Sequence, residues 1–299
     1  LGFGKYGDVD VERFRFFNPP ILVDDPAGTI VREWTDERTG QLKQRKLRED
    51  PEEAVKSTLA HTIKLTGQLG TSIVKDSTGH TVTTFFPDPN VESTSVDGRV
   101  FKADSTVWAT TREATDGEGA ADSATTNVMG TDNAGGFWGL RRIFVLFDTS
   151  AIGTDTVDSA TLSWDGQGGK VNTDNDGNDF AVITATNPAS NTALGTADYD
   201  QFKDTNGNFP IASVAMQEQS DKIDFGVLSC TTGTYNDHTL NATGLTNVVN
   251  GVSKFGVVEG HDVLDDPIGV GTENTCGFTF ADTAGTTADP KLVVTHSVA

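Results

Sequence analysis

The sequence predicts an all-β protein, an antiparallel β-sandwich that follows a separate N-terminal region. Gly is abundant (32 of 299 residues) while Met, Cys and Tyr are sparse, a composition that favours short strands joined by tight turns. Residues 143–147 (IFVLF) form an unbroken apolar run, typical of a strand buried on both faces. Residues 159–164 alternate polar and apolar side chains, as a half-buried strand does.

Residues 1–80 are predicted to hold an extended arm, a β-hairpin and one short helix. Residues 1–27 hold too many aromatic side chains for a solvated tail, and prolines at residues 19, 20 and 26 break regular elements, so this arm needs a surface in its own domain or in a neighbouring subunit. Gly40 supplies the turn of a hairpin over residues 29–47. Asp50 and Pro51 begin a helix over residues 51–65. The candidate docking residues are Phe3, Tyr6, Phe14, Phe16, Phe17 and Trp34.

Residues 81–299 are predicted to form the sandwich domain, because turn signals recur there roughly every ten residues. A hairpin over residues 72–76 and 80–86 leads into it, and short helical turns are expected near residues 196–202 and 243–249. The expected strands are residues 81–86, 97–102, 106–112, 124–129, 140–148, 157–165, 179–185, 210–215, 221–228, 234–241, 252–259, 275–281 and 290–297.

The charge is distributed unevenly along the chain. Residues 1–84 carry 12 Lys and Arg against 13 Asp and Glu, whereas residues 85–299 carry 10 against 30, which gives balances of −1 and −20. A strongly acidic body repels nucleic acid and membrane surfaces, and no apolar stretch approaches the ~18 residues that span a bilayer. We therefore expect no nucleic-acid or membrane partner, and we expect the charge-balanced segment to do the docking.

An acidic run at residues 174–179 (DNDGND) resembles a calcium loop, because Ca²⁺ prefers several oxygen ligands around a glycine turn. Its candidate ligands are Asp174, Asp176 and Asp179, although an Asx-rich hairpin turn explains the run equally well. His261, with acidic residues at 262, 265 and 266, could also bind a cation or could form a solvated turn. Apart from possible Ca²⁺, the sequence predicts no cofactor.

Trp138 lies in a predicted flexible loop, GGFWG, where an indole ring could stack on a sugar. The alternative is that Trp138 packs inside the protein or at a subunit contact. Cys230 and Cys276 fall in or beside predicted late strands, so they could form a disulfide or remain unpaired in the core.

The sequence does not contain a recognisable catalytic motif. No serine lies in a G-x-S-x-G elbow. Residues 166–170 (GQGGK) follow a strand, but the Asn- and Asp-rich run after them is not the helix start that a phosphate-binding loop requires. We therefore predict that the protein is not an enzyme.

Three blocks in order resemble one known family. They are residues 142–164, with IFVLFDTSAIGTDTVDSATLSW, residues 235–260, YNDHTLNATGLTNVVNGVSKFGVVEG, and the C-terminal FTFADTAGTTADPKLVVTHS. They are similar to the DNRLRE-type, carbohydrate-binding-module-like jelly roll, and FFPDPNVESTSVDGRVFK resembles the opening strands of versions carried by phages. The resemblance covers about residues 81–299 and implies a jelly-roll β-sandwich without a general catalytic residue set.

Members of this family occur on cell-surface proteins and in virions. We therefore expect a non-enzymatic virion structural protein, most simply a capsid decoration protein at the virion surface, docked through its N-terminal region. Its expected partners are other virion proteins and further copies of itself. The alternative is the carbohydrate-binding module of a tail fibre or of a cell-surface adhesin, which would bind a host-surface glycan outside the cell.

Overall fold

The structure, a computed structural model, describes the strands at residues 21–24, 30–36, 41–46 and 71–75, and residues 80–298 except residue 212. The chain divides into two compact units, Leu1–His61 and Thr62–Ala299. This division falls before the boundary expected at residue 80, because the strand at residues 71–75 pairs with the sandwich.

The first unit contains a small antiparallel sheet. It consists of β1 (Ile21–Asp24), β2 (Ile30–Asp36) and β3 (Gln41–Lys46), in the order β1-β2-β3. Asp36 lies opposite Gln41, so the hairpin predicted over residues 29–47 is confirmed. Trp34 lies in β2, opposite Lys43. The helix predicted over residues 51–65 and the arm residues Phe3, Tyr6, Phe14, Phe16 and Phe17 lie outside the described residues.

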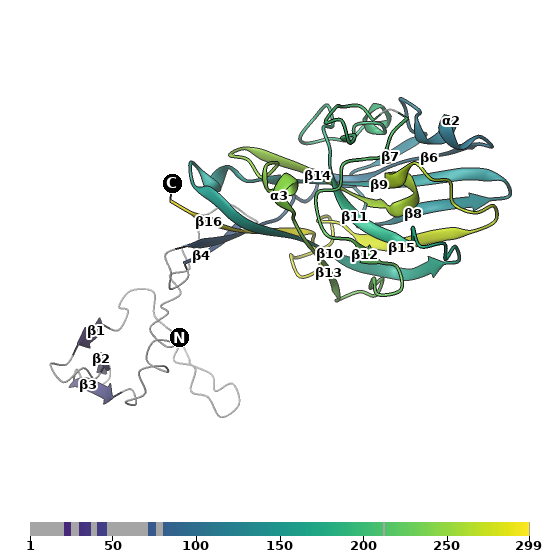
Figure 1. Cartoon of the computed structure of the whole chain (residues 1–299). Coiled ribbons are helices and arrows are strands. Elements are labelled where there is room, and N and C mark those ends of the chain that lie inside the picture. The colour runs from purple at the N-terminus through teal and green to yellow at the C-terminus, as the bar shows by residue number, and fades with distance from the viewer. Residues whose placement is uncertain are drawn as a thin grey trace. The chain divides into compact units, whose positions relative to one another are not determined.

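The second unit is all-β, as predicted (Figure 1). Among its described residues, five short helical segments connect the strands: α2 (Trp108–Arg112), η1 (Ser150–Ile152), η2 (Thr196–Asp198), α3 (Ala242–Leu245) and α4 (Gly260–Leu264). Its strands are β4 (Thr71–Lys75), β5 (Thr81–Phe85), β6 (Asp97–Ser105), β7 (Gly119–Ala121), β8 (Thr126–Ala134), β9 (Phe137–Asp148), β10 (Thr156–Asn172), β11 (Phe180–Ala185), β12 (Ile223–Asp224), β13 (Tyr235–Thr239), β14 (Val252–Glu259), β15 (Glu273–Thr279) and β16 (Lys291–Ser297).

The strands pair antiparallel in the order β12-β11-β14-β9-β8-β15-β10-β16-β5-β4, with β6 and β7 beside β9 and with β13 beside β10. The sheet curls into two layers because β10 belongs to both. Its first half pairs with β16 and β13, and its second half pairs with β15 after a register shift between Gly166 and Lys170. Gly168 and Gly169 adopt positive φ there. The glycine-rich run is therefore a bend in a strand.

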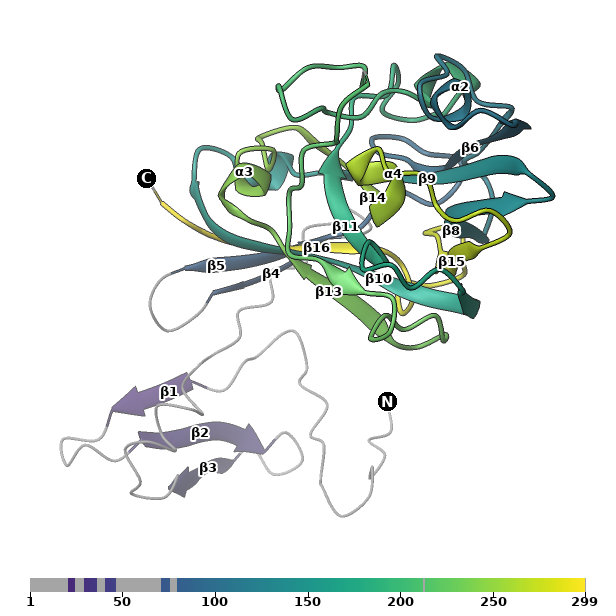
Figure 2. The same ribbon diagram turned by 45° about the vertical axis from the view of Figure 1, so that its right-hand side comes forward.

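Two hydrophobic clusters fill the sandwich. We call the cluster between the two layers the inter-sheet core; it includes Trp164, Phe278 and Leu292. The second cluster, which we call the outer core, lies on the other face of β9, β11 and β14, under α2 and the loops before β12 (Figure 2). Residues 143–147 alternate between these two cores and are all fully buried, so the prediction of a strand buried on both faces is confirmed.

Two predicted strands are wrong. Residues 108–112 form helix α2, and the described residues among 210–215 contain no strand. Both segments belong to the layer that covers the outer core, where Trp108 and Ile211 are buried. Packing of their side chains onto the sheet overrides the β-propensity of Val107, Thr110 and Thr111.

Candidate functional site

Two acidic segments that are distant in sequence meet at one edge of the sandwich. The loop of residues 173–179 connects β10 to β11, and α4 follows β14 directly. Because β11 and β14 pair with Ala181 opposite Glu259, the end of this loop lies beside the start of α4. The adjacency follows from strand pairing, so no local pattern reveals it.

His261 is the centre of this site. Its side chain is buried, its Nδ1 lies 2.7 Å from Glu259 Oε1, and its backbone N–H donates to Glu259 Oε2 at 3.0 Å. Its Nε2 lies 3.6 Å from Asp174 Oδ2 and 3.4 Å from both carboxylate oxygens of Asp176. Glu259 therefore fixes the ring so that Nε2 faces the loop.

The electrostatics of the site favour positive charge at His261. Burial alone would lower the pKa of His261, but Glu259 and Asp176 outweigh it and raise that pKa to about 9. Burial raises the pKa of Glu259, and the hydrogen bond with His261 opposes this. The pKa of Asp176 is lowered, chiefly by the backbone N–H of Asn178 and then by His261.

The predicted calcium ligands separate into two groups. Asp174 and Asp176 join His261 in a group whose ligand-type atoms all lie within 4.8 Å of one another. Asp179 instead accepts a 2.6 Å hydrogen bond from Asn274 Nδ2 and is buried. Asp174 also accepts from the backbone N–H of Gly269 at 2.6 Å, which anchors the loop. His261, considered separately in the sequence, is the residue that completes the group.

A buried ion-pair network lies on the other side of α4. Asp262 receives two hydrogen bonds from Arg142, Nε to Oδ2 and Nη2 to Oδ1, each of 2.7 Å. Arg142 also donates to the backbone oxygens of Tyr199 and Arg112, and its guanidinium lies 4.1 Å from the Tyr199 ring centroid. Burial would lower the pKa of Arg142, but Asp262 more than compensates and raises it. Sequence analysis missed this network, whose partners are 120 residues apart.

The structure places Trp138 near the start of β9. Its side chain is 9% exposed and packs edge-to-face on Trp108, with ring centroids 5.4 Å apart. Trp108 Nε1 in turn donates to Asp265 Oδ1 at 2.9 Å. Little of the Trp138 ring is left for a sugar, so the packing alternative describes Trp138 better. The neighbouring Phe137 is 49% exposed.

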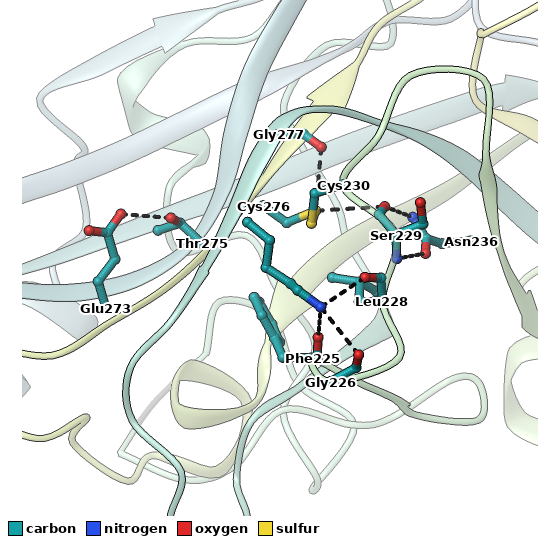
Figure 3. Close-up of a disulfide and its surroundings, with 11 residues drawn as sticks. Phe225, Gly226, Leu228, Ser229, Cys230, Asn236, Glu273, Thr275, Cys276 and Gly277 are labelled. Carbon is teal, nitrogen blue, oxygen red and sulfur yellow. Dashed lines mark hydrogen bonds between the residues drawn. A yellow bond between two sulfur atoms is a disulfide. The ribbon is translucent and has the colours of Figure 1, made fainter.

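Cys230 and Cys276 form a disulfide, which decides between the two alternatives that the sequence left open (Figure 3). Their Cα atoms are 5.5 Å apart, and both residues are buried in the inter-sheet core. The bond ties the loop after β12 to β15. Lys170 Nζ, in β10, holds the same loop to the neighbouring strand, because it donates to the backbone oxygens of Phe225, Gly226 and Leu228.

No family model matches this chain, and no curated protein matches it at a significant level. None of the helices in the described part of the chain is long and apolar enough to cross a membrane. Function must therefore be inferred from the residues of this chain.

Proposed function

We propose that the protein is a non-enzymatic structural component of a virion, a capsid decoration protein that displays its acidic sandwich outward and docks through residues 1–80. The observation that carries this proposal is the uneven charge, −20 over residues 85–299 against −1 over residues 1–84. A highly charged body stays dissolved in water and repels its own copies. A charge-balanced segment that is rich in aromatic residues is better suited to burial against a partner.

The architecture of the sandwich supports a display role. Residues of the sandwich build two extensive cores, and a disulfide and a buried ion-pair network reinforce them. A domain of this kind does not need a docking partner in order to fold. The likeness of residues 81–299 to virion-borne jelly rolls agrees with this assignment and suggests neighbouring virion proteins and further copies of the chain as partners.

Glycan recognition through Trp138 has less support. The indole packs on Trp108, whereas a stacking platform must expose its face. Glycan-array binding that disappears in Trp138→Ala would nevertheless favour the carbohydrate-binding alternative over the structural one.

The test removes residues 1–27 and measures incorporation into particles of the virus that encodes the chain. We expect the truncated protein to keep the thermal unfolding midpoint of the sandwich but to be absent from purified particles. The full-length variant Phe137→Ala, which removes an exposed aromatic ring from the sandwich itself, should still be incorporated. Incorporation of the truncated protein at the wild-type level would overturn the docking role of the arm.

A further inference from the structure

We propose that Asp174, Asp176 and His261 form a binding site for one divalent transition-metal ion, of which zinc fits the donor set best. This proposal is independent of the virion role. It concerns the edge of the sandwich where the loop of residues 173–179 meets α4.

The histidine is oriented as a metal ligand. Its Nδ1 lies 2.7 Å from the buried carboxylate of Glu259, which leaves Nε2 as the atom that faces Asp174 and Asp176. A carboxylate behind a ligating histidine is the usual outer-shell arrangement at zinc sites, because it fixes the tautomer and raises the basicity of the ligating nitrogen. Among the described residues, His296 has a carboxylate on Nδ1 in the same way, Asp155 Oδ2 at 2.8 Å, but its Nε2 contacts the hydroxyl of Thr83.

The separations between the donor atoms suit a small ion. Zinc binds nitrogen and oxygen ligands at about 2.0–2.2 Å in a tetrahedron, which places neighbouring ligand atoms about 3.3–3.5 Å apart. The His261 Nε2 lies 3.4 Å from Asp176 and 3.6 Å from Asp174. Small side-chain adjustments therefore suffice to place all three donors around one ion.

The donor set favours a transition metal over calcium. Calcium takes six to eight oxygen ligands, whereas this group offers one imidazole nitrogen and two carboxylates, donors that suit zinc and its neighbours. The third carboxylate of the calcium hypothesis, Asp179, lies outside this group and accepts a hydrogen bond from Asn274.

The site is accessible to an ion and has a structural consequence. The Asp176 side chain is 42% exposed, so an ion can enter from solvent and keep a water molecule as its fourth ligand. Asp174 bonds to Gly269, and the residue after His261 is Asp262, which binds Arg142. An ion here would join the loop of residues 173–179 to α4 and through it to the outer core.

The test is a Zn²⁺ titration of the untagged full-length protein by calorimetry, with Asp176→Asn as the ligand variant. Asp155→Asn is the matched control, because it also removes a carboxylate that contacts a buried histidine. We expect the wild type and Asp155→Asn to bind one Zn²⁺ with equal affinity. We expect Asp176→Asn to bind it at least about tenfold more weakly, because even the loss of an outer-shell partner typically costs that much affinity. Co²⁺ should give a visible absorption band in the first two proteins and a weaker band in Asp176→Asn.

Because Asp176 lies on an exposed loop, its variant should fold; equal circular dichroism spectra and equal urea midpoints without metal check this. Equal Zn²⁺ affinity in the wild type and Asp176→Asn would overturn the site. Ca²⁺ that binds more tightly than Zn²⁺, with a loss in Asp176→Asn, would overturn the assignment to a transition metal.

Discussion

The two faces of strand β9 are both buried but differ in chemistry. Ile143, Val145 and Phe147 point into the inter-sheet core, where the opposite layer supplies apolar side chains. Arg142 points into the outer core together with Phe144 and Leu146. Arg141, the neighbour of Arg142, lies on the first face, where it is partly exposed and binds Asp132.

The difference follows from what covers each face. The inter-sheet core is covered by strands, which satisfy their own backbone groups through ladder hydrogen bonds. The outer core is covered by loops and short helices, whose carbonyl oxygens do not all have such partners. Arg112 and Arg142 donate to the carbonyl oxygens of Asp262, Val214 and Tyr199. A buried guanidinium offers five donors in a fixed geometry, so these arginines serve as the hydrogen-bond donors for an irregular layer.

Replacing Arg142 removes the centre of the buried ion-pair network in the outer core, and it should have the largest effect on stability. Arg142→Met leaves Asp262 buried with an incomplete set of partners, and removal of one partner from a buried pair typically costs about 3–5 kcal/mol. We expect a loss of that size in the free energy of unfolding, measured by urea titration of tryptophan fluorescence.

Arg141→Gln is the matched control. It removes a 2.7 Å ion pair with Asp132 whose side chains are 23% and 13% exposed, so we expect a loss below about 1 kcal/mol. Equal losses in the two variants would show that the buried network contributes no more than a partly exposed pair, which would contradict the contrast between the two faces.

Breaking the disulfide tests the inter-sheet core, and it should cause the next largest loss of stability. Cys230 and Cys276 are 46 residues apart, and removing a native cross-link over such a loop costs about 2–4 kcal/mol. The urea midpoint of the wild type should fall when dithiothreitol is added. The double variant Cys230→Ala/Cys276→Ala should start at the lower midpoint and should not respond to dithiothreitol. A wild type that titrates as two free thiols when unfolded without reductant would contradict the bond.

The contrast between a core covered by strands and a core covered by loops also explains how much of the fold could be predicted from sequence. Strands that pack between layers show their burial in local patterns, as residues 143–147 do, and Gly40 marks its hairpin. The outer layer leaves no such pattern. Residues 108–112 include β-branched side chains but form α2, because Trp108 packs on Trp138 and Arg112 bonds to α4. Nothing near Arg142 in the sequence indicates a partner at Asp262.

The candidate metal site was predictable only in part, for a similar reason. An acid-rich loop is visible in sequence, so Asp174 and Asp176 could be named. That His261, and not Asp179, completes the group depends on the pairing of β11 with β14 and on Asn274 in β15. Those contacts join segments about 80–100 residues apart, which no local motif encodes.

The smallest expected effect is a gain in stability, and it concerns a buried carboxyl group with an incomplete set of partners. Asp97 begins β6 opposite Val145, so it faces the inter-sheet side, and it is fully buried. Its Oδ2 accepts a hydrogen bond from the Ala281 N–H, but its Oδ1 has no hydrogen-bond partner among the described residues. Burial raises the pKa of Asp97, and nearby Asp289 has its pKa raised to about 7, again chiefly by burial.

The sign of the pH dependence follows from these shifts. Below the unfolded-state pKa of about 4 both states hold the proton, so these groups cost no stability. As pH rises towards 7, the unfolded state releases protons that the folded state retains, so the free energy of unfolding should fall across that window. Asp97→Asn keeps an oxygen for the Ala281 N–H and removes the charge. At pH 8 it should stabilise the protein by about 1–3 kcal/mol, the usual cost of a buried group without a partner.

Urea titrations at pH 5 and pH 8 measure this difference, with Asp158→Asn on the exposed side of β10 as the control. The decrease in stability between the two pH values should be smaller in Asp97→Asn than in the wild type and unchanged in the control. A variant that is less stable than the wild type at pH 8 would mean that the charged carboxylate has a stabilising partner. The inter-sheet face of β9 would then also hold a buried charge with a stabilising partner, as the outer-core face does. The two faces would differ only in how many such charges they hold.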